Sequence, residues 1–197
     1  MSKNIILTGV GGQGTVLASK LIAAAAMAKG LPVMSAETIG MAQRGGSVFS
    51  HLRIGEGVRS PMISEKEGDL IIGFEPGETL RMLHFLKPGG QIITAVRPVI
   101  PVTSALKGDR YDGRAQLEWL EKSGYPLLKV DTDLAVKELK NPKVSNVVLL
   151  GAAAATGALG VSIEELKAAI RARLPEKLHL INEQALEHGA ALNIADK

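Results

Sequence analysis

The chain has 197 residues, 46% of them hydrophobic, which is enough to bury one sizeable core. Its 23 basic and 20 acidic residues give a net charge of +3 and are interleaved along the chain, and only 3% of the residues are aromatic. The scattered charge and the few aromatics argue against nucleic-acid binding, and the absence of cysteine excludes a cysteine-ligated iron–sulfur cluster within this chain.

The N-terminus passes from a short polar start into a brief apolar run, without the long apolar core and cleavage site of a signal peptide. The longest apolar tract, residues 147–161, is shorter than the roughly 20 residues that a membrane span requires. We therefore expect a cytoplasmic protein without a membrane segment. Because we find no repeat, low-complexity segment or linker, we expect a single domain over residues 1–197.

Strands and helices are predicted to alternate along the first half of the chain. An apolar run at residues 4–10 is followed by glycines and by an Ala-rich helix at residues 13–29. Further strands are predicted at residues 31–36, 47–54, 69–74 and 91–96, and a helix at residues 77–86 that the sequence KPGG ends. This alternation indicates an α/β fold, a Rossmann-like three-layer sandwich with a mainly parallel sheet.

The second half is predicted to be mostly helical. Helices are expected at residues 112–122, 132–139 and 145–159, with one short strand at residues 127–130. Ser162, with Glu165 three positions later, has the pattern of a capping box that begins another helix. The predicted fold therefore ends in a helical C-terminal region.

The turn after the first strand, GVGGQG, has the G-x-G-x-x-G spacing between a strand and a helix. Such glycines let a phosphate approach backbone N–H groups at the positive end of the helix dipole. Glu37 closes the second strand, where a dinucleotide site places its ribose-binding acid. Alternatively, the glycines serve only a tight turn and close helix–strand packing. The candidate binding residues of the turn are Gly11, Gly12, Gln13 and Gly14.

A second glycine-containing stretch, ETIGMAQRGGS, follows the second strand. A plain nicotinamide-dinucleotide site does not require Gln43, Arg44, Gly45 and Gly46 together. The two glycines would let the loop turn sharply and bring backbone close to a ligand or a subunit. Arg44 could supply a fixed positive charge to a phosphate, or meet a partner subunit together with Gln43, or pair with Glu37. These alternatives stay open.

Four separated motifs, in the order GVGGQG, SAETIGMAQRGGSV, DLIIGFEPGETLR and SNVVLLGAAAATG, carry a resemblance that runs nearly end to end. With them the chain resembles the gamma-type subunits of 2-oxoacid:ferredoxin oxidoreductases, and within that family the indolepyruvate type. The resemblance implies a thiamine-diphosphate enzyme that oxidatively decarboxylates an aryl 2-oxoacid such as indolepyruvate. Electrons pass through iron–sulfur clusters to ferredoxin, and the acyl group is conserved on coenzyme A.

The resemblance also implies how the work is divided between subunits. Thiamine diphosphate, magnesium and the iron–sulfur clusters are expected in a large catalytic partner, in agreement with the absence of cysteine here. This chain is then a docking subunit without catalytic residues and inactive alone, with coenzyme A as a possible ligand at the turn and at residues 43–46. The competing interpretation is a stand-alone NAD(P)-dependent dehydrogenase that uses the same turn.

Other polar residues are interpreted more simply. The four histidines lack metal-ligand spacing, so no metal site is expected. Glu75 and Glu78 are interpreted as acids that complement the N-terminus of a helix.

Overall fold

The computed structural model describes residues 2–38, 45–100 and 111–192. Six strands form one sheet in the order β2-β3-β1-β4-β5-β6. Their bounds are β1 (Lys3–Val10), β2 (Val33–Glu37), β3 (Ser47–Ile54), β4 (Gly68–Gly73), β5 (Leu86–Ala95) and β6 (Leu127–Val130). The neighbouring pairs β1–β4, β4–β5 and β5–β6 are parallel, whereas β3 is antiparallel to both β1 and β2. Five strands therefore point the same way, and the predicted mainly parallel sheet is confirmed.

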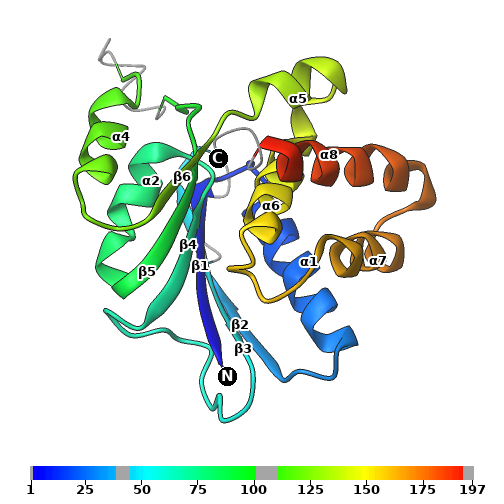
Figure 1. The fold of residues 1–197 in the computed structure, drawn as a ribbon, viewed down its shortest axis with the longest axis horizontal. Coiled ribbons are helices and arrows are strands. Elements are labelled where there is room, and N and C mark those ends of the chain that lie inside the picture. Colours follow the sequence, from blue (N-terminus) through cyan, green and yellow to red (C-terminus); the bar gives the residue numbers. More distant parts are fainter. Residues whose placement is uncertain (1, 39–44, 101–110, 193–197) are drawn as a thin grey trace.

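Helices cover both faces of this sheet. The α-helices are α1 (Thr15–Ala28), α2 (Pro76–Arg81), α4 (Arg114–Glu121), α5 (Asp133–Glu138), α6 (Ser145–Ala155), α7 (Ile163–Arg173) and α8 (His179–Leu192). Three short 3-10 helices are η2 (Leu83–Phe85), η3 (Pro142–Val144) and η4 (Glu176–Leu178). Figure 1 shows α1, α6, α7 and α8 on one side of the sheet and α2 and α4 on the other. The Rossmann-like three-layer fold with a helical C-terminal region is confirmed.

Within the described ranges, no helix is long and apolar enough to cross a membrane.

The central strand β1 supplies both halves of the core. Ile5 and Leu7 belong to the large cluster on the side of α1 and α6, whereas Ile6 belongs to the smaller cluster on the side of α2 and α4. All three side chains are fully buried. Because successive residues of a strand point to opposite faces, one apolar run holds both layers of helices. Each such side chain contributes roughly 1.5–3 kcal/mol of burial.

The helices α6 and α8 cross at close range because each contributes a glycine. A Cβ atom on Gly151 would collide with the carbonyl oxygen of Leu186, and one on Gly189 would collide with that of Val148. The neighbouring Leu150 is fully buried. Gly151 of the predicted helix at residues 145–159 therefore serves close backbone packing inside the protein.

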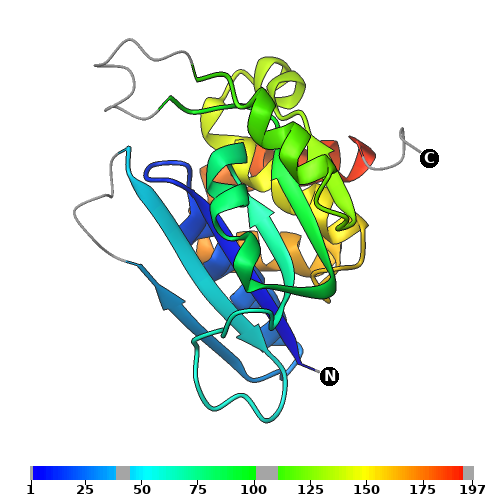
Figure 2. The same cartoon turned by 90° about the vertical axis from the view of Figure 1, so that its left-hand side faces the viewer.

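The carboxyl ends of the five like-directed strands lie along one edge of the sheet, here called the carboxyl edge. Because β3 runs the opposite way, it begins at this edge, where Ser47 pairs with Val10 at the end of β1. Figure 2 shows the start of β3 beside the turn that leads from β1 into α1. Open α/β sheets place their ligand sites at such an edge.

Most of the predicted elements are found with bounds that differ by a few residues, and the strands at residues 47–54 and 127–130 have the predicted bounds. The capping box of α7 is confirmed. Glu165 donates its backbone N–H to Ser162 Oγ (3.2 Å), and Glu165 Oε2 accepts the backbone N–H of Ser162 (2.7 Å).

The prediction that the sequence KPGG ends a helix is wrong. The helix α2 already ends at Arg81, and KPGG, residues 87–90, lies within β5. The register between β4 and β5 shifts between Gly68 and Leu70, and Gly89 has a φ of 77°. The proline and glycines of KPGG therefore lie where the regular pairing of β5 with β4 is interrupted.

Candidate functional site

The start of β3 holds the glycine turn in place at the carboxyl edge. The N–H group of Gly11 donates to the carbonyl oxygen of Gly46 (2.8 Å), and the N–H group of Gly45 donates to the carbonyl oxygen of Gly11 (3.2 Å). Gly45 has a φ of 79°, a conformation that favours glycine. The two glycine-containing stretches that the sequence analysis singled out therefore lie against each other.

The helix α1 begins directly after this turn. Gly14 is its N-cap residue, with a φ of 83°, and has no side chain with which to cap the first turn. Gly12 has a φ of 104°, whereas Gly11 is the glycine that approaches another stretch of backbone closely. The first N–H groups of a helix without a side-chain cap are left to solvent or to an anion. This end of α1 can therefore bind a phosphate or a carboxylate.

Gln13 ties the ends of two strands together. Its Oε1 atom accepts the backbone N–H of Val10 (2.7 Å), and its Nε2 atom donates to the carbonyl oxygen of Phe74 (2.7 Å). A Cβ atom on Gly9 would lie 2.7 Å from Gln13 Oε1, so the first glycine of the turn leaves room for this side chain. Both polar atoms of Gln13 are thus engaged with backbone, and the N–H groups of Gly11 and Gln13 donate to the carbonyl oxygens of Gly46 and Val10.

One cavity of about 320 Å³ lies between the turn and the end of β2. Glu37 lines it together with Gly12 and Gly14. Because β3 lies between β1 and β2, Glu37 is two strands away from the turn. The dinucleotide fingerprint instead places its acid at the end of the strand next to the glycine turn. Glu37 therefore faces the same cavity as the turn without occupying the ribose-binding position.

A second cavity, of about 530 Å³ and here called the Arg97 cavity, lies on the other side of the turn. Arg97 follows β5, Lys143 lies in η3 and Asn146 lies in the first turn of α6, and all three line this cavity beside Gly14. Arg97 pairs with Asp133 (3.2 Å) and is half exposed. Buried Asn146 donates through Nδ2 to the carbonyl oxygen of Gly14 (3.3 Å). Two cations and the N-terminal ends of α1 and α6 meet here, an arrangement that favours an anion.

Two buried carboxylates follow β4 at the same edge. Glu75 is 3% exposed and Glu78 is 7% exposed. Glu75 is the N-cap of α2: its Oε2 atom accepts the backbone N–H of Glu78 (2.9 Å), and its Oε1 atom accepts the hydroxyl of Tyr111 (2.5 Å). The predicted position of these acids at the N-terminus of a helix is confirmed, with Glu78 in the first turn of α2. Burial raises the pKa of the Glu75 carboxyl, and the hydrogen bond from Tyr111 opposes this rise. Burial and the neighbouring Glu75 raise the pKa of Tyr111.

The predicted site residues are partly brought together. The four residues of the turn, Glu37 and the pair Gly45 and Gly46 meet at the carboxyl edge, whereas Gln43 and Arg44 lie outside the described residues. Sequence reasoning missed Arg97, Lys143 and Asn146. The position of Arg97 just beyond a predicted strand end could have indicated it, because strand ends gather at one edge.

His51 lies in the interior of the protein and makes structural contacts there. It is 2% exposed on β3, and its Nδ1 atom accepts the backbone N–H of Ile63 (3.2 Å). The rings of Phe49 and Phe85 contact its edge, and among the described residues its Nε2 atom has no hydrogen-bond partner. Burial lowers the pKa of His51, so the ring is neutral at physiological pH.

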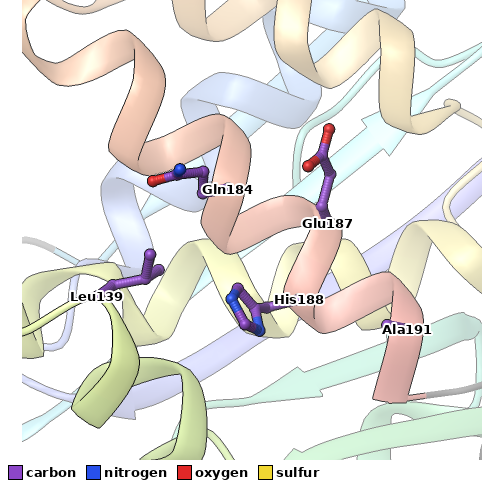
Figure 3. Close-up of a pocket in the computed structure, with 5 residues that line it drawn as sticks. All are labelled: Leu139, Gln184, Glu187, His188 and Ala191. Carbon is purple, nitrogen blue, oxygen red and sulfur yellow. The ribbon is translucent and has the colours of Figure 1, made fainter.

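A further cavity, of about 380 Å³, lies between α5 and α8 and is shown in Figure 3. Its lining residues are Leu139, Gln184, Glu187, His188 and Ala191. His188 Nε2 lies 3.2 Å from Glu138 Oε2, and Glu187 pairs with Lys167 of α7 (2.8 Å). These polar groups therefore join neighbouring helices. In the described part of the chain, no group of three or more histidine, aspartate or glutamate residues could hold a metal ion.

The sequence pattern of the pyruvate ferredoxin/flavodoxin oxidoreductase family matches residues 4–192, which is nearly the whole chain. The chain belongs to this family. The resemblance to gamma-type subunits of 2-oxoacid:ferredoxin oxidoreductases is confirmed by its relatives.

Similar members of the family include indolepyruvate oxidoreductase subunit IorB of Thermococcus kodakarensis, which is 37% identical over 94% of this chain and 93% of the relative. The subunit of the same name from Archaeoglobus fulgidus is 37% identical over 96% of this chain and 94% of the relative. The common subunit gamma of the pyruvate/ketoisovalerate oxidoreductases of Thermococcus litoralis is 29% identical over 90% of this chain and 89% of the relative.

Solved structures of the family share the fold. The gamma subunit of a keto/oxoacid ferredoxin oxidoreductase from Geobacter sulfurreducens superposes with a TM-score of 0.71 at 23% identity, covering 98% of this chain and 99% of that one. The 2-oxoglutarate:ferredoxin oxidoreductase of Magnetococcus marinus, solved with 2-oxoglutarate, coenzyme A and succinyl-CoA bound, superposes with a TM-score of 0.74 at 21% identity. That match covers 98% of this chain and 31% of the other chain.

Proposed function

We propose that this chain is the small subunit of an oxidoreductase that converts aryl 2-oxoacids such as indolepyruvate to acyl-CoA with ferredoxin as electron acceptor. Its glycine turn receives a phosphate group of coenzyme A. The observation that carries this proposal is the pair of hydrogen bonds that fixes Gly11 against Gly45 and Gly46, directly before the uncapped N-terminus of α1. A rigid turn at a helix N-terminus suits an anionic group.

The residues of the turn fit a phosphate. Gly12 and Gly14 have no side chains that would keep a ligand away from the backbone, and no side chain among the described residues caps the first turn of α1. Arg97 and Lys143 line the adjoining Arg97 cavity and add positive charge. Coenzyme A, when bound, supplies the thiol that takes up the acyl group. The part of this chain is to bind and orient its phosphate-bearing end.

Strand order favours coenzyme A over the alternative, an NAD(P)-dependent dehydrogenase. In a dinucleotide site the acid ends the second strand, which lies directly beside the first, but here β3, which runs in the opposite direction, separates β2 from β1. Glu37 lies one strand further out. A structure with the same fold, from Magnetococcus marinus, was solved with coenzyme A bound. Both observations support coenzyme A as the ligand.

The chemistry of the oxidoreductase resides in a large partner subunit, which carries thiamine diphosphate, magnesium and the iron–sulfur clusters. The absence of cysteine from this chain supports that division, because cysteine thiolates are the usual cluster ligands. Relatives named indolepyruvate oxidoreductase subunits, at 34–37% identity, support an aryl 2-oxoacid as the substrate. This chain docks on the partner with its carboxyl edge toward the shared cleft, and it is inactive alone.

Co-expression tests the subunit assignment. The chain is purified with and without its partner, and electron-acceptor reduction is followed with indolepyruvate, phenylpyruvate and pyruvate in the presence of coenzyme A. We expect turnover only in the assembled complex, with the aryl oxoacids preferred over pyruvate. Turnover of any 2-oxoacid by this chain alone, or iron bound to it, would contradict the assignment.

Charge removal at the Arg97 cavity tests the role in coenzyme A binding. Arg97→Ala and Lys143→Ala, assayed in the complex, are expected to raise the KM for coenzyme A by about tenfold, because a charge-assisted hydrogen bond contributes roughly 1.5–3 kcal/mol. Arg114→Ala is a matched control, since Arg114 makes a similar exposed pair with Asp112 and lies outside the cavity lining. If all three variants have the KM of the wild type, the cavity takes no part in binding.

Arg44→Ala tests whether the stretch at residues 43–46 contacts the ligand or the partner. If Arg44 binds a phosphate, the variant assembles normally and its KM for coenzyme A rises. If Arg44 contacts the partner, the affinity between the subunits falls first. Unchanged assembly and unchanged coenzyme A response would exclude Arg44 from both roles.

A further inference from the structure

The two buried carboxylates of α2 contact segments on either side of this helix. Glu78 Oε2 accepts the hydroxyl of Ser47 (2.5 Å), which is the first residue of β3. Glu75 Oε1 accepts the hydroxyl of Tyr111, and the backbone N–H of Gly77 donates to the same Tyr111 oxygen (3.1 Å). The N-terminus of α2 therefore anchors two parts of the chain that are far apart in sequence.

The contact between Ser47 and Glu78 lies one residue from the backbone that holds the glycine turn. Ser47 directly follows Gly46, whose carbonyl oxygen accepts the N–H of Gly11. A continuous path thus runs from the carboxylate of Glu78 through Ser47 to the pair formed by Gly46 and Gly11. Because glycines are the residues with the greatest backbone freedom, their position depends on Ser47, whose backbone pairs with Val10 and whose hydroxyl is held by Glu78.

Helix capping alone does not account for a buried carboxylate at Glu78. Glu75 already caps α2, since it accepts the N–H of Glu78. Burying a second carboxylate carries a desolvation cost, which hydrogen bonds must offset. The partners that do so are the Ser47 hydroxyl and the guanidinium of Arg81, whose Nε atom lies 3.5 Å from Glu78 Oε2. Within the part of the chain that the structure describes, the contact with Ser47 is therefore the interaction that this carboxylate makes beyond its own helix.

We propose that Glu78 is a positioning residue that, through Ser47, holds Gly45 and Gly46 against Gly11 and so fixes the glycine turn in its phosphate-binding conformation. Glu75 and Tyr111 hold the start of α2 from the opposite side and keep Glu78 in place. This inference rests on the proposed function only where coenzyme A affinity is concerned. The geometric coupling between Glu78 and Gly11 concerns the protein without ligand.

The test compares Glu78→Ala, Ser47→Ala and the double variant in the full chain. Amide resonances of Gly11 and Gly45 are recorded by ¹⁵N NMR without ligand, and the Kd of coenzyme A is measured by calorimetry. Each single variant is expected to shift both amide resonances. It is also expected to raise the Kd of coenzyme A by about fivefold, the loss of affinity expected for one hydrogen bond. The double variant is expected to match the single variants, because both remove the same contact.

Two further variants separate positioning from general destabilisation. Glu78→Gln keeps an oxygen that can accept the Ser47 hydroxyl, so it is expected to restore the amide positions and most of the affinity. Ser123→Ala removes a hydroxyl that donates to the carbonyl oxygen of Leu120 (2.6 Å) in α4, and it is expected to change neither readout. Ser47→Ala keeps the experiment informative should Glu78→Ala fail to fold.

The outcomes separate this inference from the proposed function. If the wild type binds no coenzyme A but the Gly11 resonance moves in Ser47→Ala, the positioning role stands and the proposed ligand is wrong. If the wild type binds coenzyme A and the variants bind equally well with an unmoved Gly11 resonance, the positioning role is wrong. Additive losses in the double variant would also overturn it, since the two side chains would then act separately.

Discussion

Glycines serve opposite purposes in two regions of this protein. At the crossing of α6 and α8, Gly151 and Gly189 are needed because a Cβ atom would collide with a carbonyl oxygen of the facing helix. At the carboxyl edge, Gly12 has a φ of 104°, and none of the described residues lies within 4 Å of the position that a Cβ would take. The helix crossing requires residues without a Cβ atom, whereas the turn requires a backbone conformation with positive φ, which glycine adopts readily.

This difference separates stability from function. A side chain at the helix crossing must push two buried helices apart, so its cost falls on the whole fold. A side chain at Gly12 would meet none of the described residues and would strain only the local backbone, but it would stand where a ligand would approach. Identical glycine-to-alanine changes should therefore affect different measurements in the two regions.

The largest expected effect is at the crossing. Gly151→Ala and Gly189→Ala are each expected to lower the free energy of unfolding by about 3 kcal/mol or more, because overpacking against backbone cannot be relieved by a rotamer change. Chemical denaturation measures this loss. Ala155→Ser, at an exposed position of the same helix, is the control. A Gly151→Ala protein as stable as the control would show that the helices separate without cost.

Gly14 sharpens the comparison because it combines both requirements. Its φ is 83°, and a Cβ atom there would also collide with the side chain of Asn146. Gly14→Ala is expected to lower the free energy of unfolding more than Gly12→Ala does. For Gly12→Ala, backbone strain alone predicts a loss of about 1–2 kcal/mol. In an Asn146→Ala background the excess cost of Gly14→Ala should disappear. Equal costs of the two changes in the wild type would mean that the collision is relieved elsewhere.

Gln13 tests whether the edge is held by side chains as well as by glycines. Gln13→Ala leaves the N–H of Val10 and the carbonyl oxygen of Phe74 without their partner. The expected loss is about 1–3 kcal/mol of unfolding free energy, the usual cost of unpaired backbone groups. Gln116→Ala, on α4, is a control for removal of the same side chain. A change within about 0.5 kcal/mol of that control, the range of neutral surface substitutions, would contradict the bridging role.

The smallest expected effect is a pH dependence of stability that arises from His51 in β3 and not from the helix crossing. Because burial lowers the pKa of His51, the unfolded chain binds more protons than the folded one below the ordinary pKa of 6.5. Stability should fall as pH drops from 6.5 through the lowered pKa. His51→Gln should flatten this slope. An unchanged slope in His51→Gln would assign the pH dependence to other groups.

The sequence predicts the fold where a pattern is local. The strand at residues 47–54 could be found because its polar and apolar residues alternate, and α7 because Ser162 and Glu165 lie three residues apart. Strand order could not be predicted, since nothing local states that β3 lies between β1 and β2. The role of KPGG in β5 depends on a register with β4 and was missed for the same reason.

The candidate site divides in the same way. The glycine turn was predictable from its spacing and its place between a strand and a helix. The bridging role of Gln13 was not, because its partner Phe74 lies 61 residues away. Likewise, Asn146 meets Gly14 across 132 residues, so only the folded chain brings them together.

The central claim, that the glycine turn binds a phosphate of coenzyme A, is tested most directly by following the amide resonances of Gly12, Gly14 and Thr15 while coenzyme A is added to the ¹⁵N-labelled chain. We expect saturable shifts at these three amides, with smaller shifts when dephospho-coenzyme A or pantetheine is used. Amides of α8, such as that of Gly189, should not move. Calorimetrically measured binding of coenzyme A with no change at Gly12, Gly14 or Thr15 would contradict the account.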